Sequence, residues 1–116
     1  MAHDHITLPD DPAAAVAMLK AASADGPVVV FKKSPICPVS TMAEGEFQSW
    51  LGGRDTADGL KIVYVDVIAQ RALARGLTAE LGIAHQSPQV LVFKDGELAW
   101  HESHGQLTQD TFAREV

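Results

Sequence analysis

Apolar residues in several parts of the chain form short continuous runs of the kind found in buried strands. Residues 28–31 read Val-Val-Val-Phe, and residues 60–68 and 89–93 are also mostly apolar. The first run predicts a strand that is covered on both faces of a sheet, and the other two predict further strands. An Asp-Gly pair joins the third run to residues 97–101, which is a strong signal for an antiparallel hairpin.

Between these runs, apolar residues recur at helical spacing. The spacing and the end signals predict helices over residues 12–23, 38–51, 69–81 and 109–116. Asp10-Asp11 supplies a candidate N-cap before Pro12, which suits a first helical turn. Thr108 is the candidate N-cap of the last helix, and Gly82 is placed to end the third in a left-handed conformation.

The predicted elements follow the order α-β-α-β-α-β-β-α, with no repeat and no linker long enough to divide the chain. This order predicts an α/β architecture, a central four-stranded mixed sheet flanked by helices, which matches the thioredoxin-like fold. The chain has 116 residues, enough for one hydrophobic core, so we expect a single domain over residues 1–116. Residues 1–8 show no such pattern and are expected to be a mobile tail.

Charge and hydropathy argue against two classes of partner. The formal net charge is −6, whereas nucleic-acid binding relies on clustered Lys and Arg, and Lys32-Lys33 is the only basic doublet. No apolar run approaches the roughly 20 residues that span a bilayer. The N-terminus also lacks the basic and apolar regions of a signal peptide. We therefore expect a cytoplasmic protein that binds neither nucleic acid nor membrane.

Cys37 is the only cysteine, which rules out an internal disulfide and a Cys-rich zinc site. It follows the first predicted strand and precedes Pro38 at the start of the second predicted helix. At that position unpaired backbone N–H groups and the helix dipole both stabilise a thiolate. We therefore predict that Cys37 is a catalytic nucleophile for thiol–disulfide exchange, and not a small buried apolar residue.

Ser40 stands three residues after Cys37, where an oxidoreductase of the Cys-x-x-Cys type carries its second thiol. Without that thiol, a mixed disulfide on Cys37 must wait for an external thiol to attack it. Two interpretations of Ser40 stay open. It is either a helix-surface residue with no role, or its hydroxyl donates a hydrogen bond to the thiolate.

Ser87-Pro88 precedes the third predicted strand. The proline either simply begins a strand or follows a cis peptide bond that turns the chain sharply, and we favour the cis bond. In that geometry the backbone N–H and C=O of Ser87 would be exposed beside Cys37. They could then pair with the backbone of a thiol substrate as a short antiparallel strand.

The five histidines show no metal-ligand spacing, so we expect no bound metal. Each is interpreted as a solvated side chain, although His85, near the Ser87-Pro88 turn, could influence the charge of the site. Trp50 and Trp100 are expected to be core or half-buried residues without a chemical role.

Together these segments resemble the monothiol bacilliredoxins, small proteins of the thioredoxin superfamily with a Cys-Pro-x-Ser site. The likeness covers nearly the whole chain. It rests on residues 30–34, 37–40, 64–67, 85–90 and 94–96. Ile36 is a departure, because the family often has Thr or another polar residue just before the cysteine, and this change would affect substrate contacts more than the chemistry.

The resemblance implies that the protein removes bacillithiol, a low-molecular-weight thiol, from mixed disulfides on client proteins. Cys37 would be the nucleophile and Pro88 the site proline. The residues expected to contact the substrate are Ile36, Pro38, Ser40, Ser87 and Pro88. Bacillithiol would be a co-substrate with no bound cofactor. The partners would be S-thiolated clients and a second thiol, redoxin or reductase that regenerates Cys37.

Two alternatives are left open. One is a glutathione-linked protein resembling the monothiol glutaredoxins, although the cluster-binding members of that class carry Cys-Gly-Phe-Ser where this chain has Pro38-Val39. The other is a non-enzymatic thioredoxin-fold adaptor whose cysteine is only modified under stress. The adaptor predicts modification without turnover.

Overall fold

A five-stranded mixed sheet forms the centre of the protein in a computed structural model that describes residues 4–54 and 59–116. The strands are β1 (Asp4–His5), β2 (Val28–Lys33), β3 (Lys61–Asp66), β4 (Gln89–Lys94) and β5 (Glu97–Ser103). They lie in the order β1-β3-β2-β4-β5. The runs of apolar residues in β2 and β4 are buried along their whole length, as strands in the middle of a covered sheet must be.

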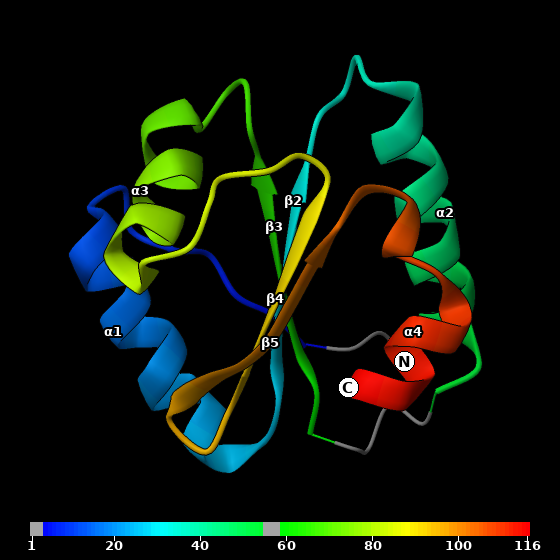
Figure 1. Ribbon diagram of the computed structural model, residues 1–116. Coiled ribbons are helices and arrows are strands. Elements are labelled where there is room, and N and C mark those ends of the chain that lie inside the picture. Colours follow the sequence, from blue (N-terminus) through cyan, green and yellow to red (C-terminus); the bar gives the residue numbers. More distant parts are fainter. Residues whose placement is uncertain (1–3, 55–58) are drawn as a thin grey trace.

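Helices cover both faces of this sheet. They are α1 (Pro12–Ala22), α2 (Pro38–Gly52), α3 (Arg71–Leu81) and α4 (Gln109–Glu115), with short 3₁₀ turns at η1 (Ser23–Asp25) and η2 (His104–Gln106). Figure 1 shows α1 and α3 against one face and α2 and α4 against the other. In the described part of the chain, no helix is both long enough and apolar enough to cross a membrane.

The two faces of the sheet carry separate apolar cores, because side chains of successive strand residues point to opposite faces. Under α1 and α3 the core contains Leu19, Val28, Val30, Val65, Leu77, Leu91 and Phe93. Under α2 and α4 it contains Val29, Phe31, Phe47, Ile62, Val90, Val92 and Phe112. On the second face, Phe47 is in contact with Phe31, Trp50 and Phe112 at ring-centroid distances of 5.2–5.8 Å. Trp50 is half-buried, in agreement with its interpretation as a packing residue.

The register of the strands brings four connecting segments to one edge of the sheet, namely the edge at which β2, β3 and β5 end and β4 begins. β2 runs parallel to β3 and antiparallel to β4, with Lys32 opposite Gln89. β5 is antiparallel to β4, with Ser103 opposite Gln89. The segments after β2, after β3, before β4 and after β5 therefore leave the sheet at the same edge, which Figure 1 shows at the top.

The expected four-stranded sheet and mobile tail need correction. The four predicted strands are all present, but Asp4 and His5 add a fifth that pairs in parallel with β3. Leu8 is buried in the core under α1 and α3. Residues 4–8 are therefore part of the domain, and residues 1–3 lie outside the described residues. The strand is only two residues long, so it carries no alternation that could reveal it in the sequence.

The three predicted helix caps are confirmed, although the third helix begins at Arg71 and not at residue 69. The Asp11 side chain accepts a hydrogen bond from the Ala14 amide, and Thr108 caps α4 by accepting from the Thr111 amide. Gly82 ends α3 with φ of 72°, a left-handed conformation that glycine adopts without steric cost.

Gly76 allows a close approach between α3 and α1. A Cβ atom at this position would overlap the ring of Pro12, whereas a Cβ at Gly45 in α2 would meet no atom within 4 Å. We expect Gly76→Ala to lower the free energy of unfolding by about 1–3 kcal/mol through overpacking. Gly45→Ala should raise it by about 0.5–1 kcal/mol, because alanine favours a helix over glycine. Urea denaturation of both variants tests this, and a gain in stability for both would contradict the close contact.

Candidate active site

Cys37 lies at the N-cap position of α2, with extended backbone angles of φ −102° and ψ 118°. Its carbonyl accepts the first hydrogen bonds of the helix, from the amide and the hydroxyl of Thr41. The side chain is half-buried, and its thiol is not in a disulfide. The structure therefore places Cys37 at the helix start where sequence reasoning expects a reactive thiol, directly before the first-turn N–H groups.

Ser40 holds the turn that carries Cys37. Its side chain is buried, and Oγ accepts a hydrogen bond of 2.8 Å from the Ser34 amide. The interpretation of Ser40 as a helix-surface residue is therefore wrong. The hydrogen bond ties the first turn of α2 to the end of β2, so it limits the conformations open to the turn of residues 34–37.

The peptide bond between Ser87 and Pro88 is cis, as predicted. Pro88 is buried and Ser87 is half-buried. Among the described residues, no backbone group pairs with the Ser87 amide or carbonyl. The Ser87 hydroxyl oxygen is also buried without a hydrogen-bond partner. These groups provide unpaired donors and acceptors at the same edge of the sheet as the turn that carries Cys37.

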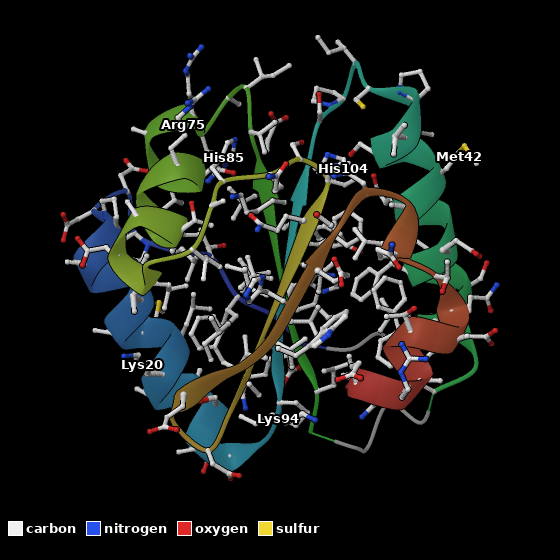
Figure 2. The ribbon with its side chains drawn as sticks, viewed as in Figure 1. Lys20, Met42, Arg75, His85, Lys94 and His104 are labelled. Carbon is white, nitrogen blue, oxygen red and sulfur yellow. The ribbon has the colours of Figure 1, made fainter. Side chains whose placement is uncertain are left out.

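The segment after β5 joins the same edge. The His104 amide donates a 3.1 Å hydrogen bond to the carbonyl of Pro88, which fixes η2 against the turn before β4. Figure 2 shows His85 and His104 toward this end of the sheet and Lys94 at the opposite end. The strand register and this hydrogen bond together place the Cys37 turn, the Ser87-Pro88 turn and η2 at one edge.

Exposed apolar side chains surround the start of α2. Ile36 is 80% exposed, Met42 is 73% exposed and Val39 is 43% exposed. Between α2 and the segment after β5 lies an apolar pocket of about 450 Å³. It is lined by Val39, Met42, Ala43, His104, Gly105, Leu107 and Thr108. This surface suits an apolar segment of another chain more than a small charged molecule.

A buried lysine lies beneath the same edge. Lys32 is fully buried in β2, and its Nζ lies 2.7 Å from His85 Nδ1 and donates to Gln89 Oε1 at 2.8 Å. By strand alternation it is on the face covered by α1 and α3. Burial is the main cause that lowers the pKa of Lys32 from 10.5 to about 8, and the charge of Arg75 acts in the same direction. Lys32 therefore remains largely charged at neutral pH.

His85 is neutral beside this ammonium group. Burial, then the positive charges of Lys32 and Arg75, hold the pKa of His85 below its ordinary value. An ammonium group has only donors, so Nδ1 is the acceptor in this hydrogen bond. The interpretation of His85 as a solvated side chain is therefore wrong.

Asp66 organises the remaining connection at this edge. One carboxylate oxygen accepts hydrogen bonds from the amides of Ile68 and Ala69, and these bonds lower the pKa of the carboxyl group. Within residues 4–54 and 59–116, no three His, Cys, Asp or Glu side chains come together as a metal site. What the edge offers chemically is one thiol, a turn with unpaired backbone groups and an apolar surface.

The family model for the monothiol bacilliredoxin BrxC matches residues 11–112, which include Cys37, Ser40 and the Ser87-Pro88 turn. The chain belongs to the monothiol bacilliredoxin family. Membership confirms the resemblance seen in the sequence and indicates a thiol redox role.

Solved structures share the fold of this bacilliredoxin. A protein with a thioredoxin fold has 23% sequence identity and a TM-score of 0.74, covering 97% of this chain and 92% of the other. A thioredoxin from Malassezia sympodialis has 18% identity and a TM-score of 0.65, covering 97% and 86%. Fasciola hepatica thioredoxin has 16% identity and a TM-score of 0.62, covering 90% and 94%. At these identities the likeness establishes the thioredoxin fold alone.

Sequence reasoning missed the buried group formed by Lys32, His85 and Gln89. One signal was available. Lys32 extends the apolar run of a strand predicted to be covered on both faces, and a charge in such a strand needs polar partners. The partners themselves are more than 50 residues away in the sequence, so only the tertiary structure identifies them.

The lowered pKa of Lys32 predicts a pH-dependent stability. Between about pH 8 and 10.5 the unfolded chain binds the proton that the folded protein has lost, so stability rises with pH in this window. The free energy of unfolding of the wild type, minus that of Lys32→Met, should therefore rise by about 1–3 kcal/mol from pH 8 to 10. Denaturant titrations at several pH values test this. Parallel profiles of the two proteins would contradict the burial of a charged Lys32.

Proposed function

We propose that this protein removes bacillithiol from mixed disulfides on client proteins, with Cys37 as the nucleophile. The observation that supports this most directly is a lone thiol at the N-terminus of α2 within a family-matched Cys-Pro-Val-Ser site. The reaction fits a reducing compartment such as the cytoplasm, because a lone cysteine persists there as a thiol.

The exchange proceeds in two steps. The Cys37 thiolate attacks the bacillithiol sulfur of the client mixed disulfide, a bond forms between these two sulfurs, and the client leaves as a thiolate that takes up a proton. Cys37 then carries bacillithiol. A second thiolate, from bacillithiol or a partner redoxin, attacks the bacillithiol sulfur and releases Cys37, and the second thiol ends in the new disulfide.

The client would dock on the edge of the sheet beside Cys37. The unpaired Ser87 backbone can accept a short antiparallel strand of the client. Ile36, Val39 and Met42 offer apolar contacts next to it. In this proposal the exposed apolar side chains and the Ser87 backbone contact the client. Ser40 and Pro88 are buried, so they stabilise the turns and do not contact the client themselves.

A client-release assay tests the proposal. A bacillithiolated protein is incubated with wild type, with Cys37→Ser and with no enzyme, in the presence of excess bacillithiol. We expect the wild type to release the client thiol and Cys37→Ser to fall to the rate without enzyme, because the hydroxyl that replaces the thiol cannot exchange with a disulfide. Equal release by wild type and Cys37→Ser would rule out the proposed role of Cys37.

The same assay separates the alternatives. A glutathionylated client that is released faster than the bacillithiolated one would favour a glutathione-linked protein. Stable modification of Cys37 without release of further client would favour the adaptor. Mass spectrometry of the protein from oxidant-stressed cells adds an independent observation, since the mass gained by Cys37 identifies the thiol.

Ser40→Cys tests whether the missing second thiol is the reason that the wild type would need an external thiol to release Cys37. Oxidoreductases of the Cys-x-x-Cys type carry their second thiol at this position, so we expect the introduced thiol to attack the Cys37 mixed disulfide and displace bacillithiol. After one turnover without added thiol, mass spectrometry should show the bacillithiol adduct on the wild type and an internal disulfide in the variant. An adduct retained by both proteins would show that a thiol at position 40 does not reach the disulfide.

A further inference from the structure

Lys32 is a charged residue in a buried strand whose preceding residues are all apolar. In the pairing of β2 with β4, the four pairs from Val28 opposite Phe93 to Phe31 opposite Val90 are apolar on both strands. Only Lys32 opposite Gln89 is polar, and both of these side chains are buried. Replacing a whole buried group of interacting charges by well-packed apolar residues is often neutral or stabilising. An apolar core at these positions would therefore serve stability equally well, and stability alone does not explain the group that Lys32 forms with Gln89 and His85.

The partners of Lys32 lie on both sides of the Ser87-Pro88 turn. His85 comes two residues before Ser87, and Gln89 comes directly after Pro88. One ammonium group therefore holds both ends of the segment that contains the unpaired Ser87 backbone. A buried donor with two acceptors at 2.7 Å and 2.8 Å restricts these ends far more than a solvated lysine would.

Gln89 extends the same group of hydrogen bonds. Its Nε2 donates to the Ala84 carbonyl at 3.0 Å, and its Oε1 also accepts from the Gln86 amide at 3.3 Å. Lys32 is also the penultimate residue of β2, the strand that leads through the turn of residues 34–37 to Cys37. The backbone of Lys32 thus leads to the segment that carries Cys37, while its ammonium group is hydrogen-bonded on both sides of the Ser87-Pro88 turn.

We infer that Lys32 is a positioning residue, whose hydrogen bonds to His85 and Gln89 hold the Ser87-Pro88 turn in register with Cys37 for docking of a client peptide. This inference rests on the proposed function, because it concerns the binding of the disulfide that Cys37 attacks. It predicts that Lys32 affects substrates with a peptide backbone and leaves the intrinsic reactivity of the thiol unchanged.

Lys32→Met keeps the length of the side chain and removes the ammonium group. Two rates are measured: release of bacillithiol from a thiolated peptide with excess bacillithiol, and alkylation of Cys37 by iodoacetamide, which is small, neutral and has no strand to dock. We expect kcat/KM for the peptide to fall on the order of 10- to 100-fold, chiefly through KM, because a misplacement of about 1 Å can cost up to about 100-fold. The alkylation rate should stay within about 2-fold of wild type.

Lys94→Met is the matched control. Lys94 lies at the other end of β4, and its Nζ donates to the carbonyl of Glu115. The variant removes the same charge and a lysine hydrogen bond, so we expect wild-type values in both assays. An unchanged kcat/KM in Lys32→Met would overturn the inference. An equal loss in both assays would also overturn it, since Lys32 would then act on the thiol itself.

A second pair of variants keeps the test valid if Lys32→Met does not fold. His85→Leu removes one acceptor of Lys32 from a half-buried position, and His85→Asn keeps a polar acceptor there. Reduced kcat/KM in His85→Leu and recovery in His85→Asn would support the positioning role. Equal activity of the two variants would overturn it.

One measurement separates this inference from the proposed function. If the wild type releases no bacillithiol, the proposed function fails, and the positioning of the turn is then judged by hydrogen exchange. The Gln86 amide donates to the Oε1 atom that Lys32 also contacts. Faster exchange at Gln86 in Lys32→Met than in wild type would support the inference, and unchanged exchange would overturn it.

Discussion

The antiparallel pairing of β2 with β4 is the constraint on which the site depends. Pairing Lys32 with Gln89 sets the residues that follow β2 beside the residues that precede β4. A shift of one residue would move Lys32 to the opposite face of β2, away from His85 and Gln89, so these buried hydrogen bonds oppose a change of register. Cys37 and the Ser87-Pro88 turn are 50 residues apart in the sequence, and this register brings their segments to the same edge of the sheet.

Around this pairing, buried polar groups hold the turns in place, and exposed apolar side chains form the surface near Cys37. Ser40 and Lys32 are buried, and each forms hydrogen bonds to a turn that the substrate would meet. Ile36 and Met42 are exposed and make the surface near Cys37 apolar. The proposed exchange would need both features, since the turns would have to stay in place while the surface accepts client chains of different sequence. The apolar pocket beside α2 extends this surface toward η2.

The absence of a second thiol affects how the site works more than how it folds. A serine at position 40 fits the buried space at the first turn of α2 and satisfies the Ser34 amide. In the proposed exchange it would leave a mixed disulfide on Cys37 without an internal partner. The same side chain therefore contributes to the local structure and, under that proposal, would make the exchange dependent on an external thiol.

The sequence by itself determined the order of the main elements, the helix caps, the cis proline turn and the lone thiol at a helix start. These features depend on neighbours within a few residues, through periodicity, capping and turn chemistry. Only the tertiary structure decided the two-residue β1, the burial of Ser40 and the partners of Lys32. β1 is too short for a pattern, and it is a strand only because β3 lies beside it. The partners of Lys32 are set by pairing between distant strands, so no local pattern could reveal that His85 and Gln89 meet one buried charge.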